Sequence, residues 1–317
     1  ISLRGEDSKG YISSILSQVS SGAEGDSGGI TIATDSLSLL DGAVIDASTL
    51  GKGDAGAIDI TATDSISLSG EDSEGFVTAI VSEVKPGAVG NAGGITLEVG
   101  TLPLPVGALI GASTFGEGNA GAINIRAANS VFLSGESSPS QDFISAIVST
   151  VESTAVGSSG GINLETANLS LSYSAQISAS TFGEGDAGVV QIRATDSISL
   201  SGLDRDGFGS AIVSQVSLGA VGSSGGITID TPRLSLTDGG VIDASTEGTG
   251  DAGTVQVWAT DSISLSGEDR NGFSSGIFSQ VYLEAVGSAG GITIDTANLS
   301  LTEGALITAS TEGTGDA

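Results

Sequence analysis

The chain repeats itself, and this repeat limits the folds that it can adopt. The string Ile-Ser-Leu-x-Gly begins at Ile1, Ile66, Ile198 and Ile263, and the variant Val-Phe-Leu-Ser-Gly begins at Val131. The repeats are therefore 1–65, 66–130, 131–197, 198–262 and 263–317, and the last is truncated. Self-similarity at a fixed period is typical of solenoids, in which each unit buries its apolar face against its neighbours. We expect 1–317 to be a single continuous β-solenoid and a fragment of a longer array.

Each repeat divides into a half of about 28 residues and a half of about 37 residues. In the first half, Ile30 and Ile32 alternate with Thr31, and similar short runs follow, separated by turn residues. Alternation with a period of two predicts β-strands with one buried face. No segment keeps the 3.6-residue period of a helix.

Equivalent positions of successive repeats carry the same apolar residue, which predicts side-chain columns along a stack. Three such columns are Ile30, Ile95, Ile162, Ile227, Ile292; Leu39, Leu104, Leu171, Leu236, Leu301; and Ile45, Ile110, Ile177, Ile242, Ile307. Two more are Leu68, Leu133, Leu200, Leu265 and the aromatic series Tyr11, Phe76, Phe143, Phe208, Phe273. We expect an all-β fold, a right-handed parallel β-helix of about ten coils, two per repeat, and about 45–50 Å long.

The composition of the chain limits the classes of molecule that it can bind. The formal net charge is -29, from 38 acidic and 9 basic residues. This argues against nucleic acid and anionic membranes as partners and favours a soluble surface. Cysteine and histidine are absent, so disulfides and Cys or His nucleophiles are excluded. The most apolar stretch, 102–112, contains two prolines and is too short to span a bilayer.

The segment Gly225–Gly239 resembles the repeats of filamentous-haemagglutinin-like large exoproteins of two-partner secretion systems. Ala244-Ser245-Thr246 and Gly250–Gly253 strengthen the likeness, which is closest to cyanobacterial S-layer-like or haemagglutinin-like repeat proteins. The resemblance covers the whole chain. It implies a secreted protein on the outer surface of a bacterium, exported by an outer-membrane partner transporter. It also implies a long β-helical fibre for adhesion or aggregation, and assigns no functional residue.

A glycine-rich string recurs in the repeats and matches the dinucleotide-binding fingerprint G-x-G-x-x-G, as in 51–56 and 248–253. The fingerprint has meaning only between a strand and a helix, so we interpret these strings as turns. Each string carries one polar residue at the same place: Asp54, Asn119, Asp186, Asp251 and Asp316. A calcium ladder would need six to eight converging oxygens per ion. We therefore expect solvated turn residues, with at most weak, diffuse calcium binding and no cofactor.

The Ser-Thr pair that begins at Ser48, Ser113, Ser180, Ser245 and Ser310 is invariant among the repeats. One hypothesis is an ice-binding or sugar-binding threonine ladder. The other, which we favour, is that a hydroxyl at each corner bonds backbone left unpaired by the turn. Asp46 and Asp243 precede two of these corners, but the other repeats have Gly111, Ser178 and Thr308 there. We expect no catalytic residues and no metal site, because the surface repeats so closely that no unique cleft is evident.

At two places the sequence differs from the other repeats in a way that predicts a local structural feature. Pro103 and Pro105 flank Leu104 and should remove two ladder donors toward one neighbouring coil, which predicts a bulge or widened spacing there. Trp258 lies out of phase with the buried Val255 and Val257, which predicts that it points outward.

The sequence thus predicts a structural or adhesive rod of a cell-surface fibre that mediates attachment, aggregation or sheath formation, and not an enzyme. Its expected partners are copies of itself, end to end or side by side, and surface polysaccharide, without membrane insertion. A carbohydrate-binding adhesin face is the alternative. A β-helical polysaccharide lyase or hydrolase is a third hypothesis, which would need one repeat with a singular charged cluster.

Overall fold

The computed structural model describes residues 1–7, 10–135 and 144–316, and these residues form strands, turns and loops without a helix. The strands make two parallel sheets, a larger sheet of 11 strands and a smaller sheet of 10 strands. The expected surface loop at 137–142 and the aromatic Phe143 lie outside the described residues.

The strands of the larger sheet carry odd numbers, apart from the last. They are β1 (Ser2–Arg4), β3 (Ile30–Leu40), β5 (Ile58–Ser69), β7 (Ile95–Leu104), β9 (Ile123–Ser134), β11 (Ile162–Ser172), β13 (Val190–Ser201), β15 (Ile227–Thr237), β17 (Val255–Ser266), β19 (Ile292–Thr296) and β20 (Leu299–Thr302). The strands of the smaller sheet are β2 (Ser14–Leu16), β4 (Val44–Asp46), β6 (Thr78–Val81), β8 (Ala108–Gly111), β10 (Ala146–Val148), β12 (Gln176–Ser178), β14 (Ala211–Val213), β16 (Val241–Asp243), β18 (Gly276–Val281) and β21 (Leu306–Thr311).

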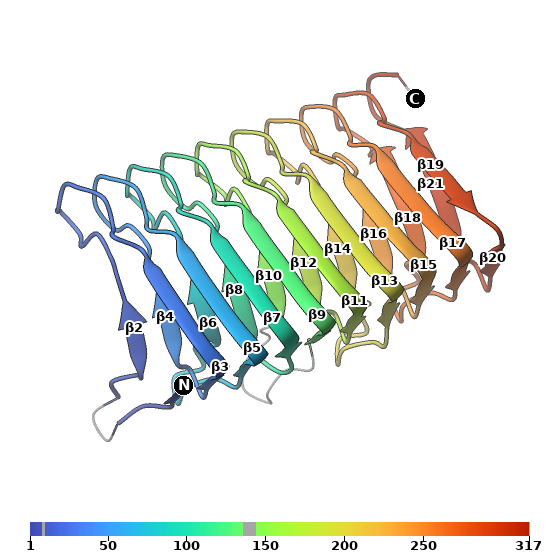
Figure 1. The fold of residues 1–317 in the computed structure, drawn as a ribbon. Helices are drawn as coiled ribbons and strands as arrows, with labels where there is room; N and C mark the ends of the chain where they lie inside the picture. The colour runs from blue at the N-terminus through green and yellow to red at the C-terminus, as the bar shows by residue number, and fades with distance from the viewer. Residues whose placement is uncertain (8–9, 136–143, 317) are drawn as a thin grey trace.

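Each coil contributes to both sheets and then returns to the next rung, so the described chain forms ten coils of a parallel β-helix. In Figure 1 the strands of the larger sheet descend in front and the chain returns behind them while advancing toward the C-terminus, which makes the helix right-handed. Ile30 pairs with Ile58, and Ile58 pairs with Ile95, so short and long coils alternate as expected. The predicted fold class is confirmed.

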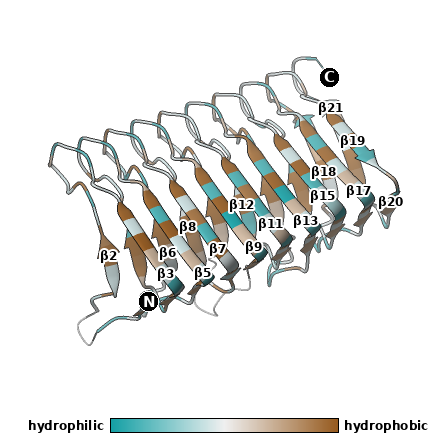
Figure 2. Cartoon of the chain, in the orientation of Figure 1, coloured by the Kyte–Doolittle hydropathy of each residue, from teal (hydrophilic) through white to brown (hydrophobic). Residues whose placement is uncertain are grey.

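The interior is a set of aliphatic columns. Leu39, Leu68 and Ile110 have no exposed surface, and hydrophobic residues alternate with hydrophilic ones along the strands (Figure 2). The predicted Ile and Leu columns are buried through the middle of the rod. They become exposed at the last coil, where Leu301 is 41% exposed because no described coil covers it.

The aromatic series behaves differently from the aliphatic columns. Tyr11, Phe76, Phe208 and Phe273 are exposed, each at the end of a small hairpin that only the long coils contain. An aspartate four residues earlier holds each hairpin: Asp72 Oδ1, for example, accepts the backbone N–H of Phe76 at 2.9 Å. These four aromatic hairpins stand outside the smaller sheet. The series is therefore a row on the surface and not part of the core.

The glycine-rich strings form the corner that precedes each long coil, and they are turns as predicted. Gly53 has a φ of +135°, and a Cβ added there would lie 2.2 Å from the Gly25 carbonyl oxygen of the coil below. The strand β5 follows this corner instead of a helix. Glycine is needed here both for the dihedral angle and for the close stacking of corners.

The two prolines of β7 interrupt pairing on one side of the strand. The pairing of β7 with β9 continues to Leu104, whereas its pairing with β5 stops at Thr101. In the matching coil, β15 pairs with β13 as far as Leu236. The expected one-sided loss of the ladder is confirmed, because proline has no N–H to donate.

We expect faster amide hydrogen exchange in residues 66–69 and 102–106 than in the matching residues 198–201 and 234–238. Losing about one net hydrogen bond of roughly 1 kcal/mol corresponds to an increase of about fivefold in local opening. Hydrogen-exchange mass spectrometry measures this difference. The double variant Pro103→Ser and Pro105→Thr carries the residues of the matching coil and should restore slow exchange. Equal protection of both coils in the wild-type chain would contradict the prediction.

Candidate functional site

The polar residues at the glycine corners hold neighbouring coils together. Asp54 Oδ1 accepts the backbone N–H of Asn91 at 2.7 Å, and Asp186 Oδ1 accepts that of Ser223 at 2.8 Å. Asn91 Oδ1 in turn accepts the N–H of Asn119 at 3.0 Å, so the bonds continue from coil to coil. These side chains are exposed in turns, as expected, and each also satisfies a backbone donor of the next coil.

Both residues of the first four Ser-Thr pairs are buried at the corner, and they differ in whether their hydroxyls are hydrogen-bonded. Ser48 Oγ accepts the N–H of Glu83 at 3.0 Å, and Ser180 and Ser245 make the same bond to the next coil. The favoured interpretation of a backbone-bonding hydroxyl is thus confirmed. The threonines that follow are buried, and their hydroxyls have no hydrogen-bond partner: Thr49, Thr114, Thr181 and Thr246. A buried ladder cannot contact ice or sugar, so that hypothesis was wrong.

The outer face of the larger sheet carries a row of alternating charge. Glu98, Arg126, Glu165, Arg193, Asp230, Trp258 and Asp295 are successive partners in the ladder. Arg126 pairs with Glu165 at 2.9 Å, and Arg193 lies 3.4 Å from Asp230. Trp258 is 39% exposed in this row, so the prediction that it points outward is confirmed.

Two grooves lie against the outer face of the smaller sheet, and they are equivalent sites of the repeat. The N-terminal groove, of about 550 Å³, is lined by Tyr11, Asp46, Phe76, Glu83 and Lys85 among others. The C-terminal groove, of about 610 Å³, is lined by Phe208, Asp243, Phe273, Phe278 and Tyr282 among others. Residue numbers in the two grooves differ by 197, which is three repeats.

The same two contacts hold the aspartate at the floor of each groove. Asp243 accepts the Gln215 side-chain N–H at 2.6 Å and the Ser245 backbone N–H at 2.9 Å. Asp46 accepts the corresponding bonds from Gln18 at 2.6 Å and from Ser48 at 2.7 Å. Both carboxylates are almost fully buried between coils. Each groove thus has an aspartate at its floor that is fixed in the same way.

In the N-terminal groove, the chain supplies its own cation. Lys85 Nζ lies 2.5 Å from Glu83 Oε2, and the Glu83 side chain is only 5% exposed. Burial raises the pKa of Glu83, and the charge and hydrogen bond of Lys85 oppose that rise. The pKa of Lys85 is also raised: burial would lower it, but attraction to Glu83 and Asp46 outweighs this. The ammonium group is therefore paired with Glu83 and attracted to Asp46.

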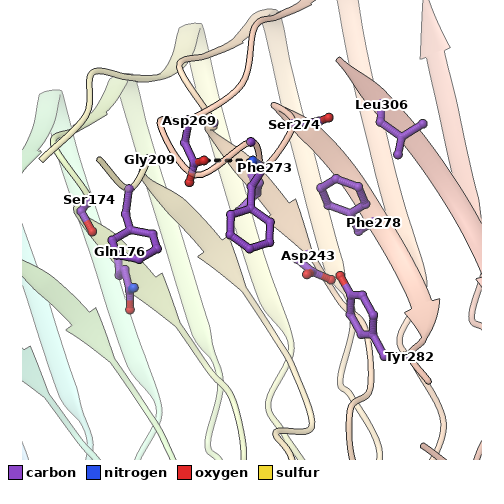
Figure 3. Close-up of a pocket in the computed structure, with 14 residues that line it drawn as sticks. Ser174, Gln176, Gly209, Asp243, Asp269, Phe273, Ser274, Phe278, Tyr282 and Leu306 are labelled. Carbon is purple, nitrogen blue, oxygen red and sulfur yellow. Dashed lines mark hydrogen bonds between the residues drawn. The ribbon is translucent and has the colours of Figure 1, made fainter. Parts of the chain in front are cut away.

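In the C-terminal groove, Gln280 and Tyr282 stand where the other groove has Glu83 and Lys85. Phe278 also replaces Val81, so two further aromatic rings line this groove. Figure 3 shows the Tyr282 hydroxyl pointing toward Asp243, with the rings of Phe273 and Phe278 nearby. Burial raises the pKa of the Asp243 carboxyl to about 6. Burial and the nearby Asp243 also raise the pKa of Tyr282.

No unique cleft was evident in the sequence, and the structure has two grooves at equivalent positions of the repeat. Asp46 and Asp243 each lie at the floor of a groove, and only Asp243 lies among four aromatic side chains. A signal was present in the sequence. Only two repeats have an aspartate at the position of Asp46 and Asp243, and no other repeat has an aromatic residue at the position of Phe278 or Tyr282. The sequence did not show that these departures share one groove.

No protein-family model, curated protein or solved structure matches this chain. Across residues 1–7, 10–135 and 144–316, no three His, Cys, Asp or Glu side chains are placed to hold a metal ion. The described residues also include no helix long and apolar enough to cross a membrane. The C-terminal groove offers aromatic faces and a carboxylate that can accept further hydrogen bonds, which suits it to binding a small polar or charged group.

We expect Thr114→Val to stabilise the rod by about 1 kcal/mol, because the change removes a buried hydroxyl that lacks a partner. Thr114 pairs with Val84 and Val151 in its column, so valine suits the site. The midpoint of denaturant unfolding measures the effect. The neighbouring change Ser113→Ala removes an acceptor from the Thr150 N–H and should destabilise by about 1 kcal/mol. A lower midpoint for Thr114→Val would contradict the prediction.

We expect Asp243 to make the folded chain less stable as the pH rises. Because burial raises its pKa from 3.8 to about 6, the folded state binds the proton more tightly than the unfolded chain. The resulting stability is full below pH 3.8 and disappears as the pH rises through about 6. On the order of 1 kcal/mol of this loss falls between pH 5 and pH 8.

Asp243→Asn should therefore gain about that much stability relative to wild type between pH 5 and pH 8, as measured by denaturant unfolding at both values. Asp54→Asn, at an exposed corner, serves as the control for removing one negative charge. If Asp243→Asn changes stability equally at both pH values, the carboxyl is not perturbed as described.

Proposed function

We propose that the chain is a structural rod of a secreted cell-surface fibre that mediates attachment, aggregation or sheath formation. The observation that carries the proposal is the uniform stacking of ten coils, in which each strand of the larger sheet pairs in parallel with the next. At about 4.8 Å per coil, the 317 residues extend roughly 48 Å along one axis. An array built this way gains length in proportion to its number of repeats.

Three kinds of ladder support stiffness along that axis. The backbone ladders of both sheets run through all ten coils. The aliphatic columns fill the interior, and the side-chain bonds at the glycine corners join neighbouring coils on the outside. Bending the rod would stretch one of these ladders, so the cross-section resists bending in several directions. The acidic surface opposes non-specific association of rods.

We also propose export by an outer-membrane partner transporter, as the resemblance to filamentous-haemagglutinin-like exoproteins implies. Two features support this route. The chain has no cysteine, so a transported chain needs no disulfide to fold. Each coil also stacks on the coil before it, 28 or 37 residues earlier in most of the chain, so folding can proceed coil by coil. In this proposal the chain is not an enzyme, and further copies of the rod are its main partners.

A carbohydrate-binding face is the second candidate, and Trp258 is the observation that favours it. The indole lies half-exposed on the flat larger sheet beside Asp295 and Thr296, with a hollow of about 480 Å³. An exposed indole can stack on a sugar ring while neighbouring polar groups bond its hydroxyls. Trp258 is the only tryptophan, so its fluorescence reports directly on polysaccharide binding there. A blue shift in emission would support this candidate.

Small-angle scattering tests the rod. Doubling the chain from five to ten repeats should increase the maximum dimension by about 48 Å and leave the cross-section unchanged. Ile110→Asp, which places a charge in a fully buried column, should disrupt this scaling. A compact particle for the longer chain would contradict the proposed rod.

Immunogold electron microscopy tests the location. Antibodies against the repeat should label fibres on intact cells that produce the protein. Labelling that appears only after the cells are permeabilised would contradict a surface fibre.

A further inference from the structure

The two grooves provide a comparison within one chain, because each has an aspartate at its floor and the side chains above that aspartate differ. In the N-terminal groove, the Lys85 ammonium group lies 2.5 Å from Glu83 and is attracted to Asp46. The long stem of Lys85 lines the groove together with Tyr11 and Phe76. This groove therefore shows that its architecture accommodates an alkylammonium group.

The C-terminal groove keeps the aspartate at its floor and has Gln280 and Tyr282 at the positions of the Glu83–Lys85 ion pair. Its described lining residues include Asp243 and Asp269 but no lysine or arginine. Arg270 lies on the aromatic hairpin of Phe273, where its guanidinium donates to the Arg205 carbonyl oxygen at 3.3 Å, and it does not line the groove. Asp269 is engaged by the backbone N–H groups of Asn271 and Phe273. Asp243 is thus the carboxylate at the floor that a ligand can neutralise.

The C-terminal groove, which has no lysine, is lined by more aromatic side chains than the N-terminal groove. Phe208 and Phe273 come from two successive aromatic hairpins, Phe278 comes from β18, and Tyr282 follows that strand. The rings of Phe273, Phe278 and Tyr282 lie near Asp243 in Figure 3, and Phe208 also lines the groove. Aromatic faces attract cations through the ring quadrupole, most strongly when the cation is desolvated, and such cages recognise organic ammonium ions.

We propose that the C-terminal groove binds an alkylammonium group, which enters between these four rings and is neutralised by Asp243. The Tyr282 side chain stands where Lys85 stands in the equivalent groove, so the ligand lies beside the Tyr282 ring, with its ammonium group toward Asp243 and its alkyl part against the rings. The strongly acidic surface of the chain raises the local concentration of such cations. This inference does not rest on the proposed fibre, because it concerns binding by a single chain.

Charge distinguishes this ligand from a sugar. A sugar site needs several hydrogen-bonding groups directed at hydroxyls, whereas most of the surface of this groove is apolar and comes from aromatic and aliphatic side chains. Burial has also raised the pKa of Asp243, so a positive charge placed beside it relieves an unfavourable desolvation.

The test uses n-butylammonium, a mimic of the lysine side chain, with saturation-transfer NMR titrations at pH 8. We expect n-butylammonium to bind at least tenfold more tightly than the neutral n-butanol. Asp243→Ser, which introduces the residue found at Ser178, should weaken the binding of n-butylammonium about tenfold and leave that of n-butanol unchanged. Tyr282→Lys should abolish binding, because it supplies the groove with its own ammonium group.

The reciprocal variant keeps the test informative if one change disturbs folding. Lys85→Ala should open the N-terminal groove and leave Glu83 buried without its partner. Millimolar n-butylammonium should then raise the melting temperature of Lys85→Ala more than that of wild type, and n-butanol should not. Circular dichroism confirms that each variant keeps its β-structure.

Three results would overturn the proposal. Equal binding of n-butanol and n-butylammonium would make the groove an apolar site. Binding of methyl glucoside that is lost in Asp243→Ser, without binding of n-butylammonium, would make it a sugar site. Unchanged binding of n-butylammonium by Tyr282→Lys would place the ligand elsewhere on the chain.

Discussion

Register between successive coils is the constraint on which the rest of this structure depends. A single coil has too little apolar surface to bury by itself, and it becomes stable only when the coils above and below cover its edges. The pairing of Ile58 with Ile30 on one side and with Ile95 on the other aligns the residues as far as Ala62, after which the register shifts by one residue on both sides. A slip of one residue would exchange the inner and outer faces of each strand and expose the aliphatic columns.

The same register explains why the corners are so conserved from repeat to repeat within this chain. A corner must turn the backbone without a strand ladder to satisfy its polar groups. Side chains supply those bonds: Ser48 and Asp54 each accept a backbone N–H from the next coil. Gly53 lets the corners approach closely, because any Cβ there would collide with the coil below. The glycine-rich strings and the Ser-Thr pairs, which resemble ligand-binding motifs in the sequence, therefore stabilise the contact between neighbouring coils.

Regular stacking also makes departures from the repeat informative. The outer positions of the smaller sheet are free to vary, since they do not contribute to the aliphatic columns. Asp46 and Asp243 occupy such positions, and each is bonded in the same way although the groove above it differs. One groove is filled by the chain's own Lys85, and the other is lined by Phe278 and Tyr282. A rod of nearly identical coils can thus carry individual sites without any change in its scaffold.

The sequence by itself determined the repeat boundaries, the alternation of short and long coils, the buried Ile and Leu columns and the outward direction of Trp258. These follow from periods of two residues and of one repeat, which are properties of the chain alone. It also predicted the consequence of Pro103 and Pro105, because a missing N–H weakens a ladder in any register.

Only the tertiary structure decided what happens where the period of two breaks down. At the corners, the turn geometry places Ser48 between coils and buries Thr49, which no alternation could assign. The hairpins carry Phe76 and Phe273 to the outside, although their recurrence alone resembles that of a core column. The grooves join residues from different coils, such as Asp243 and Tyr282, that are 39 positions apart and meet only because the coils stack.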